Sequence, residues 1–340
     1  MNKKNLRISV IIPVREGGRY DPVLESLQDS NYPPEHFEIL VVEGKSPSYQ
    51  RNRAAEAAAG DLLYFLDNDA SIADENFSLI NEHFQNKEII GLGGPSLTNI
   101  ESPYIQKAMA LAFSSVFGTF RMHHKFDELG RVRKAGEGEI ILTNFCIKKE
   151  VFLKEKLNEY LYPSEENELV ARLVQKRYKM IHDPKMKVFR NQRTTLLEFG
   201  KQLFRYGRGR AEQFFEAPRL HHLVFSIPSL FVVYLFSLIF LKIPFLLLPL
   251  LCYLFLNLME STLSSIKLKR IFPIFFLPIA FIIMHTSFGV GYIYGVIKRL
   301  LGLKTQPDRN INIIRVKTFD QPLSSISCFC YPHPDWTGSS

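Results

Sequence analysis

The sequence predicts an α/β fold with a mainly parallel central sheet, followed by C-terminal membrane helices. Two observations predict this order. In residues 1–198, short apolar runs alternate with amphipathic stretches that contain Ala and Glu, as strands alternate with helices around a parallel sheet. After residue 220, three runs (223–241, 243–259 and 271–297) contain no Asp, Glu, Lys or Arg. Each run reaches or approaches the ~20 residues that cross a bilayer.

The elements of the front part follow one another in a regular order. Three apolar runs read as strands: ISVIIPV (8–14), FEILVVEG (37–44) and LLYFLDNDA (62–70). Between the first two, DPVLESLQDS (21–30) reads as a helix with Pro in its first turn. Between the last two, YQRNRAAEAAAG (49–60) reads as a helix, with Ser48 as the expected cap and Gly60 as the expected end.

Two carboxylates, Asp67 and Asp69, stand where the third strand ends. Ligands of such sheets bind outside the carboxyl ends of the strands, and these two acids lie on one side of an extended chain. Mg²⁺ or Mn²⁺ is the expected guest, because hard cations take oxygen ligands and share themselves with substrate phosphates. The alternative is that the Asp-Asn-Asp sequence only closes the strand as a turn.

Charge, cysteines and the N-terminal segment narrow the class of protein. Many of the basic residues behind the net charge of +8 lie beside the apolar runs, at 201–219, 267–270 and 298–317. This is expected next to a membrane, so no nucleic-acid partner is predicted. The first apolar stretch is too short for a signal peptide, which leaves the front part in the cytoplasm. The cysteines have no metal-ligand spacing and fit a reducing compartment: Cys146, Cys252, Cys328 and Cys330.

SVIIPV, EILVVEG and RNRAAEAAAGDLLYFLDNDA, in this order and spacing, resemble the opening of family 2 glycosyltransferases of the GT-A fold. The resemblance covers roughly residues 6–215. It implies a nucleotide-sugar-binding domain in which Asp67 and Asp69 hold the divalent ion on the donor diphosphate. It also implies donor contacts by Pro13, by Glu43 at the nucleobase and by Arg51. The family often has two successive acids where this chain has one, so an exposed strand-end acid is the alternative for Glu43, and a solvated helix arginine for Arg51.

The stretch YPSEENELVARL (162–173) resembles the T/G-E-D-x-E-L segment of the family, whose aspartate is the catalytic base. Glu166 stands in the place of that aspartate, one methylene longer, and Glu165 is the second candidate. A carboxylate positioned to take the proton of the attacking hydroxyl contributes ~10²–10⁴-fold. Acids also gather at helix N-termini because the helix dipole favours them, which is the alternative interpretation.

Two further segments share the resemblance. GEGEIILTNFCIKKEVF (136–152) resembles the part that lines the acceptor side, and FGKQLFRYGRGRAEQFF (199–215) the Q-x-x-R-W segment of membrane-bound relatives. In the latter, Gln202, Arg205 and Tyr206 take the motif positions, with Tyr in place of Trp, so that Arg faces the diphosphate and the aromatic covers the acceptor end. YGRGRA resembles bacterial exopolysaccharide enzymes, including the succinoglycan-type transferases. Without any family, the segment reads as an interfacial basic and aromatic helix with five side chains for lipid: Phe199, Leu203, Phe204, Phe214 and Phe215.

These features predict four regions: a GT-A glycosyltransferase domain (1–198), an interfacial amphipathic segment (199–220), a membrane region of two or three apolar segments (221–303) and a tail (304–340). The predicted function is metal-dependent, inverting transfer of a sugar from a nucleotide-diphosphate donor, a UDP-sugar in first place, to a polyprenyl-linked saccharide in cell-surface polysaccharide synthesis. We expect a multi-pass protein of the inner (plasma) membrane with a cytoplasmic catalytic domain. Its expected partners are membrane lipid and other polysaccharide-assembly proteins.

Three alternatives stay open. A polyprenyl-phosphate glycosyltransferase would share the chemistry and differ in the acceptor. A processive polysaccharide synthase needs a secretion channel, and three apolar runs are few for that. A non-catalytic membrane scaffold would keep the fold as a binding module, but the acids at 67, 69 and 166 are present.

The basic residues also predict how the apolar runs enter the membrane. If all three runs crossed, Lys298, Arg299 and Lys304 would lie outside, against the positive-inside rule. The third run contains Pro273, Pro278 and several glycines, so we expect it to re-enter without spanning. The prediction is a spanning hairpin, a re-entrant third segment and a cytoplasmic tail. Three full spans are the alternative.

Overall fold

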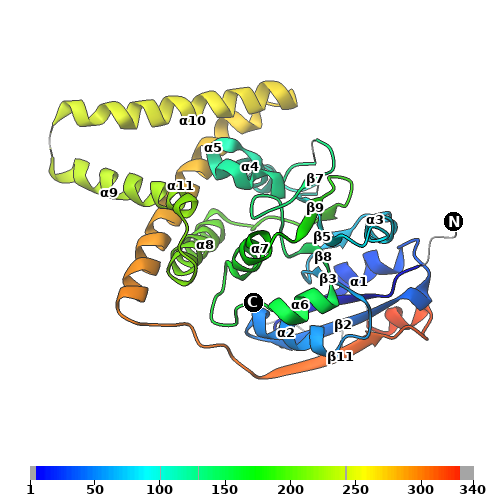
Figure 1. Cartoon of the computed structure of the whole chain (residues 1–340). Helices are drawn as coiled ribbons and strands as arrows, with labels where there is room; N and C mark the ends of the chain where they lie inside the picture. The colour runs from blue at the N-terminus through cyan, green and yellow to red at the C-terminus, as the bar shows by residue number, and fades with distance from the viewer. Residues whose placement is uncertain (1–4, 100, 129, 242, 330–340) are drawn as a thin grey trace.

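The computed structural model describes residues 5–99, 101–128, 130–241 and 243–329 (Figure 1). It contains a large mixed sheet with helices on both faces and a group of long apolar helices to one side. Across the large sheet the strands lie in the order β11 (Ile311–Lys317), β2 (Phe37–Gly44), β1 (Ile8–Val14), β3 (Leu62–Leu66), β8 (Asn144–Lys148), β5 (Ile89–Gly93), β9 (Lys179–His182) and β7 (Arg133–Lys134). A small sheet has the order β4 (Ser71–Ile72), β10 (Val188–Phe189) and β6 (Ser96–Leu97). The predicted α/β class is confirmed.

The large sheet is mixed rather than mainly parallel. β2, β1 and β3 run parallel, as expected, and so do β5 and β9. β8 lies between β3 and β5 and is antiparallel to both, while β11 and β7 pair antiparallel at the two edges. Helices connect the parallel strands at the start of the chain, and their alternation is visible in the sequence. The direction of the later strands depends on long connections for which the pattern carries no signal.

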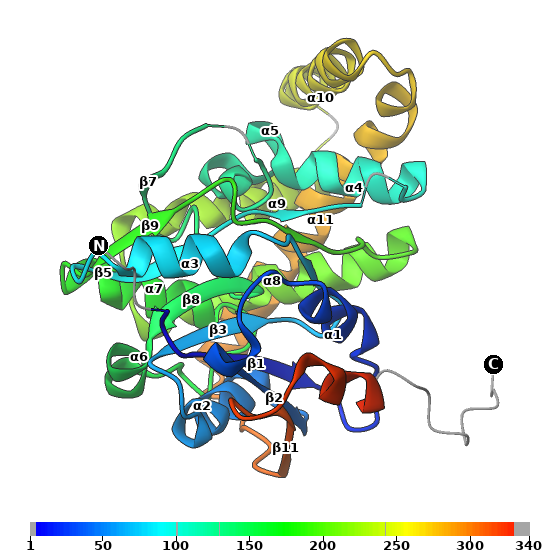
Figure 2. The ribbon, with the colours of Figure 1, turned by 90° about the vertical axis from the view of Figure 1, so that its right-hand side faces the viewer.

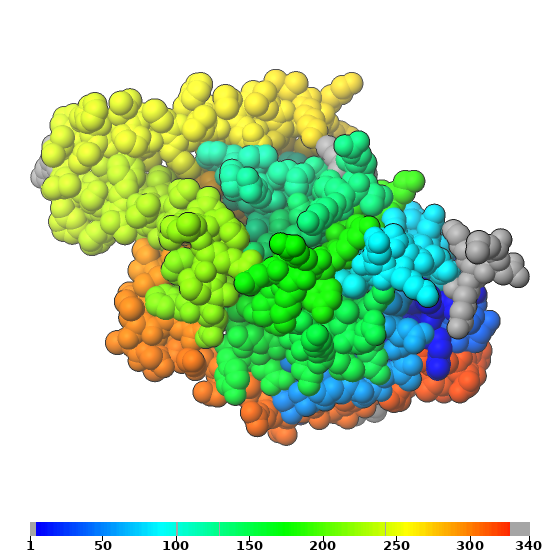
Figure 3. Space-filling model, viewed as in Figure 1, coloured from blue at the N-terminus to red at the C-terminus, as the bar shows by residue number. Residues whose placement is uncertain are grey.

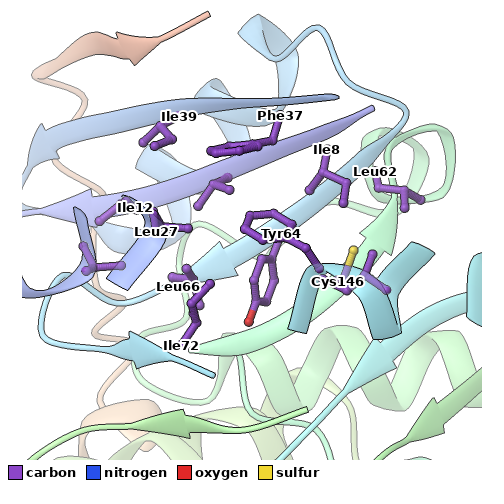
Figure 4. Close-up of a cluster of buried hydrophobic side chains, with 14 of the residues drawn as sticks. Ile8, Ile12, Leu27, Phe37, Ile39, Leu62, Tyr64, Leu66, Ile72 and Cys146 are labelled. Atoms are coloured by element: carbon purple, nitrogen blue, oxygen red, sulfur yellow. The ribbon is translucent and has the colours of Figure 1, made fainter. Parts of the chain in front are cut away.

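Helices cover both faces of this sheet. α1 (Asp21–Gln28) and α3 (Asn76–Phe84) lie on one face, and α2 (Pro47–Ala57), α6 (Lys149–Glu155) and α7 (Glu165–Gln175) lie on the other. Figure 4 shows the first face, where Phe37, Tyr64 and Leu27 pack together. β1 and β3 are buried along their whole length, which explains why their sequences are uninterrupted apolar runs.

The limits of α2 differ from the predicted 49–60. The helix begins at Pro47, with Ser46 and not Ser48 as its N-cap, and ends at Ala57. Pro is favoured at the first position of a helix because a backbone N–H at that position would have no acceptor within the helix. Ser48 lies inside the helix, where its hydroxyl donates a hydrogen bond of 3.3 Å to the carbonyl of Leu161.

The segment after the apolar helices returns to the α/β domain. β11 pairs with β2 from Ile311, opposite Gly44, to Lys317, opposite Ile39. The buried Lys317 ammonium donates a hydrogen bond of 2.8 Å to the carbonyl of Phe37. Residues 311–317, expected to be part of a separate tail, therefore complete an edge of the sheet. The 3-10 helix η5 (Leu323–Phe329) follows, and Cys330 lies outside the described residues.

Three helical stretches are long and apolar enough to cross a membrane: Leu220–Phe240, Pro244–Leu268 and Phe272–Leu300. The first combines the 3-10 helix η3 (Leu220–Ser226) with α9 (Ile227–Phe240), and the second combines η4 (Pro244–Leu246) with α10 (Leu247–Leu268). The third is α11 (Phe272–Leu300). α9 and α10 form a hairpin that projects from the α/β domain, whereas α11 runs across their direction and along the side of the domain (Figures 1 and 2).

α8 (Leu196–Glu216) packs lengthwise on α11 through glycines. A Cβ added at Gly207 would lie 2.0 Å from the Phe288 carbonyl oxygen of α11, and one at Gly291 would lie 2.0 Å from the Phe204 carbonyl oxygen of α8. Small residues are what allow two helix backbones to approach this closely. The glycines that predicted a broken third segment are therefore contact points of a continuous helix, and that part of the prediction is wrong.

Two side chains of α8 that we expected to face lipid are buried. Phe199 and Leu203 pack with Phe113 of α4 (Tyr104–Ser114) and with Phe281 and Met284 of α11. The reason is that α8 packs against both helices and so hides this face. The far end of α8 remains open, where Phe215 is 44% exposed.

Candidate active site

A cavity of about 1160 Å³ lies outside the carboxyl ends of β1, β2 and β3. Its polar end is formed by the ends of these strands and the residues after them, by α2, by the start of α7, by the middle of α8 and by Arg190. The lining residues there are Pro13, Arg15, Lys45, Arg51, Asp67, Asp69, Glu165, Glu166, Arg190, Arg205 and Tyr206. Its other end is lined by α5 (Val116–Thr119), η3, α9, α10 and α11: Phe117, Phe225, Ile227, Phe231, Tyr253, Met284 and Phe288. A single cavity thus connects strand-end acids with apolar helices.

The acids at the end of β3 belong to a chain of ion pairs. Arg190 donates from one guanidinium nitrogen to Asp67, at 2.7 Å, and from the other to Asp69, at 3.1 Å. Arg51 binds Asp67 at 2.9 Å and Glu165 at 3.3 Å. Burial acts to raise the pKa of Asp67, but the charges of Arg190 and Arg51 outweigh it and lower this pKa below its ordinary value. Asp67 is therefore ionised at neutral pH.

The donor atoms of Asp67 and Asp69 fit a divalent ion. Both carboxylates converge on a single cationic group, the Arg190 guanidinium. Mg²⁺ and Mn²⁺ prefer carboxylate oxygens and are commonly bound by one or two of them together with substrate phosphates. The same two carboxylates can hold such an ion if Arg190 turns away from them. The positive charge of Arg190 would then suit the phosphates of a bound substrate.

Glu165 is the buried member of the acid pair on α7, with 5% of its surface exposed. Burial raises the pKa of Glu165 to about 7, although Arg51 acts in the opposite direction. Before it, Ser164 has a left-handed backbone with φ of 94°. Gly209 of α8 lies against this turn, where an added Cβ would be 2.1 Å from the Pro163 carbonyl oxygen. α8 therefore supports the turn that carries both glutamates.

Glu166 faces a different set of groups. The Lys125 ammonium lies 2.9 Å from one carboxylate oxygen, and the backbone N–H of Leu142 donates to the other at 2.8 Å. Lys125 also donates to Asn167, at 2.9 Å, and burial lowers the pKa of this lysine. Leu142 belongs to the segment 136–152, which the resemblance placed on the acceptor side. Glu166 is thus held between a lysine and that segment.

The remaining predicted donor residues divide into two groups. Pro13, Arg205 and Tyr206 line the cavity, whereas Glu43 and Gln202 do not. Gln202 donates to the Tyr206 hydroxyl at 2.8 Å, so it supports a cavity residue from behind.

Glu43 connects the tail to a loop of the cavity. It accepts hydrogen bonds from Asn312 of β11, at 3.1 Å, and from the N–H of Gly17, at 3.4 Å. Gly18, next along the chain, lines the cavity. The neighbouring Gln50 donates to the carbonyl of Val14 at 2.8 Å and also to that of Val42, and so joins the ends of β1 and β2.

The apolar end of the cavity is built around His285 of α11. Its ring nitrogens contact the Tyr253 hydroxyl of α10, at 2.9 Å, and the Phe117 carbonyl oxygen of α5, at 3.1 Å. Phe117 also packs edge-on against Phe281, with ring centroids 4.9 Å apart. These contacts join the hairpin to the α/β domain beside the site.

Glu137 fastens the start of the hairpin to the α/β domain. One carboxylate oxygen faces the Nε2 atoms of His221 (3.4 Å) and His222 (3.2 Å), and the other lies 3.3 Å from Arg210. Burial acts to raise the pKa of Glu137, but His222 and Arg210 lower it to about 2. Among the described residues, this is the only group of three or more His, Cys, Asp or Glu whose ligand atoms all lie within 4.8 Å of one another, and its carboxylate is already paired with Arg210.

Sequence reasoning missed Arg190 and Lys125. Arg190 follows β10, which has only two residues and therefore no periodicity to mark it as a strand end. Lys125 ends a 3-10 helix, η2 (Phe120–Lys125), in a region with no regular pattern. The available signal was electrostatic: a group of acids in a buried site needs nearby cations, and these have to come from elsewhere in the chain.

No protein-family model and no curated protein matches the chain. Its structure is similar to that of the mannosyltransferase PcManGT from Pyrobaculum calidifontis, solved in complex with GDP-Man and Mn²⁺. The TM-score is 0.54 at 12% identity, and the match covers 86% of this chain and 87% of that one. Residues 1–349 of S. aureus TarS match with a TM-score of 0.41 at 14% identity, over 91% of this chain and 96% of that one. The similarity to PcManGT shows that the chain has the fold of a glycosyltransferase. Three apolar helical stretches lie between α8 and β11.

Proposed function

We propose that the protein is a metal-dependent, inverting glycosyltransferase. It transfers a sugar from a nucleotide-diphosphate donor, a UDP-sugar in first place, to a saccharide on a polyprenyl carrier in cell-surface polysaccharide synthesis. The observation that carries the proposal is the single cavity that joins the paired acids of β3 and α7 to a wall of apolar helices. A water-soluble donor and a lipid-linked acceptor need these two kinds of surface side by side.

The donor occupies the polar end. Asp67 and Asp69 would hold the divalent ion, which would supply positive charge to the leaving diphosphate. Arg190 and Arg205 line the same end and supply further positive charge for the phosphates. The charges of Arg190 and Arg51 keep Asp67 ionised, the latter through an ion pair of 2.9 Å.

The acceptor hydroxyl is activated by a carboxylate of α7. Glu166 is the first candidate because its two partners, Lys125 and the Leu142 N–H, fix its orientation while the group still lines the cavity. Glu165 is the second, because its pKa of about 7 suits proton transfer at neutral pH. In either case the base accepts the proton of the attacking hydroxyl, and the sugar is transferred with inversion.

The carrier lipid lies along the apolar end. Phe117, Phe225 and Phe231 line this end, and α9, α10 and α11 that form it have the composition of membrane helices. Burial of an isoprenoid chain there would lower the free energy by about 25 cal/mol for each Å² of apolar surface removed from water.

A donor panel tests the proposal. Purified protein in detergent is offered UDP-, GDP- and dTDP-sugars with Mn²⁺, and binding and hydrolysis are measured. We expect one sugar nucleotide to be bound and slowly hydrolysed. Both binding and hydrolysis should be lost in EDTA and in the Asp69→Asn variant. Asp74→Asn, which removes an exposed acid just after β4, is the matched control and retains activity. Full turnover in EDTA contradicts the metal role.

A further inference from the structure

We infer that α11 lies flat on the membrane surface, on the same side as the α/β domain, and that only the α9–α10 hairpin enters the hydrocarbon. The surface concerned is the exposed face of α11, and its partner is the headgroup region of a lipid bilayer. This inference does not depend on the proposed function.

Both ends of α11 are attached to the α/β domain. At its start, Phe272 stacks on Tyr104 of α4, with ring centroids 4.9 Å apart. Near its end, Lys298 binds Glu212 of α8 at 2.8 Å, and Arg299 pairs with Glu216. A helix of 29 residues is about 43 Å long, more than the ~30 Å of the hydrocarbon core, so a crossing helix would hold its ends on opposite sides.

The middle of α11 is held at the depth of α8. Contacts between the two helices run from Phe199 and Leu203 on α8, which meet Leu277 to Met284, through Gly207 and Gly291 to the ion pair of Lys298. α8 carries many charged side chains: Glu198, Lys201, Arg205, Arg208, Arg210, Glu212 and Glu216. Each Lys, Arg or Asp at the centre of a membrane costs about 2.5–3.5 kcal/mol. If α11 crossed, it would draw these charges and the polar end of the cavity into the hydrocarbon.

The exposed residues of α11 form one stripe. Outside a gap between Ile282 and Val290 they follow helical spacing, and they are apolar or aromatic, from 39% exposed at Phe276 to 73% at Leu300: Phe275, Phe276, Ile279, Ile282, Val290, Tyr294, Ile297 and Leu300. The rest of the helix packs on α8 and α4 and on the neighbouring parts of α9 and α10. One apolar face on a helix with a protein-covered opposite face is the pattern of an in-plane interfacial helix. Basic residues at both ends, Arg270 and Lys304 among them, suit anionic headgroups.

The tail confirms the side on which α11 ends. β11 begins shortly after α11 and pairs along its length with β2, so that it forms one edge of the large sheet of the N-terminal domain. The chain therefore returns to the side from which it entered the membrane.

The hairpin is much less buried within the protein than α11. Leu230, Phe236 and Phe240 of α9 are at least 60% exposed, as are Leu251 and Phe255 of α10. Figure 3 shows this hairpin, in yellow-green and yellow, projecting beyond the rest of the molecule, while α11, in orange, follows its side. The polar second half of α10 lies back on the domain, where Ser115 donates to Glu260 at 2.8 Å.

Depth-dependent quenching of tryptophan tests the inference. In a Trp336→Phe background, Phe275→Trp, Val290→Trp and Ile297→Trp report on the exposed stripe of α11, and Val233→Trp is the control on α9. The full chain is reconstituted in phosphatidylethanolamine–phosphatidylglycerol vesicles that contain lipid brominated at carbons 6 and 7 or at carbons 11 and 12. We expect the three α11 positions to be quenched to a similar extent and at least twofold more by the shallow bromines, and Val233→Trp more by the deep ones. Deep quenching at position 290 with shallow quenching at 275 and 297 overturns the inference.

A reporter on the otherwise unaltered chain gives an answer that is independent of these substitutions. A fluorescent protein fused after Ser340 should fold and fluoresce in the cytoplasm, and alkaline phosphatase fused there should be inactive. Active phosphatase would place the tail outside, require α11 to cross, and overturn the inference.

Discussion

At the residue scale, the two glutamates that begin α7 are neighbours in sequence but have different partners. Glu165 belongs to the chain of ion pairs that continues through Arg51 to Asp67, on the donor side. Glu166 is bound by Lys125 and by the backbone of the segment 136–152. This division favours Glu166 as the base that meets the acceptor, and Glu165 as a group that tunes the donor side.

Glu166→Gln should lower turnover by roughly two to four decades, the usual contribution of a general base, with little change in donor affinity. The measurement is kcat and donor Kd for the variant beside Glu150→Gln, an exposed acid on α6 that serves as the control. If Glu165→Gln is inactive while Glu166→Gln retains normal turnover, the base is Glu165.

Glu165 should also make stability depend on pH. Its folded pKa of about 7 lies above the ordinary 4.5, so the folded chain holds an extra proton between these values. The contribution of Glu165 to the free energy of unfolding is largest below pH 4.5. It falls by on the order of 3 kcal/mol as the pH rises to 7. Glu165→Gln has no such proton. The melting temperature of the parent relative to this variant should therefore fall from pH 5 to pH 8, and a constant difference would contradict the assignment.

The sequence analysis named the acids that line the polar end of the cavity but missed two of the cations paired with them. Asp67, Asp69 and Glu166 stand beside recognisable strand and helix ends, where sequence patterns are informative. Arg190 and Lys125 follow a two-residue strand and a 3-10 helix, and only the folded chain brings them to the acids. The sequence also did not predict that Glu43 lies away from the cavity. Glu43 contacts Asn312 of β11, a strand far along the chain.

At the element scale, the contact of α8 with α11 fixes the position of the turn that carries Glu165 and Glu166. Gly207 and Gly291 bring α11 close to one side of α8, and Gly209 brings that turn close to another. The position of α11 therefore affects the position of Glu165 and Glu166 through α8.

Gly291→Ala should destabilise the protein by about 1–3 kcal/mol, the usual cost of overpacking, because the added methyl group would lie 2.0 Å from the Phe204 carbonyl oxygen. Gly200→Ala is the matched control. Its methyl group would lie 3.2 Å from the movable Ser287 hydroxyl and in ordinary contact, at 3.5 Å, with Ile283 Cγ2, and Ala favours the helix by up to ~1 kcal/mol. Thermal unfolding in detergent should separate the two variants, and equal melting temperatures would contradict the packing.

Elements with strong local patterns were predicted, and those defined by distant partners were not. β1, α1, β2, α2 and β3 follow the expected order because buried strands and short amphipathic helices alternate there. β7 and β10 have two residues each and carry no pattern. β11 has strand-like composition, but its place beside β2 depends on the membrane helices returning the chain to its start.

At the scale of the whole molecule, the three apolar helical stretches interrupt a domain whose last strand follows them. β11 covers the outer edge of β2 and places Asn312 on Glu43. An uncovered strand edge presents unpaired backbone groups and promotes association.

Deletion of residues 304–340 should therefore cause aggregation and weaken donor binding at least severalfold. Deletion of residues 330–340 alone leaves β11 in place and is the control. Size-exclusion chromatography and donor titration of the two truncated proteins provide the measurement, and a monodisperse, fully active 304–340 deletion would show that the strand is dispensable.

The most direct test of the central claim, that one cavity joins a sugar nucleotide to a lipid-linked acceptor, is transfer of label between them. Purified protein is mixed with a radiolabelled sugar nucleotide from the donor panel, Mn²⁺ and a polyprenyl-linked saccharide extract, and label in the organic phase is counted. We predict time-dependent labelling of the lipid that disappears with EDTA, with Asp69→Asn and with Glu166→Gln, and persists with Asp74→Asn. Absence of labelled lipid with every donor, or labelling that survives Asp69→Asn, would contradict the account.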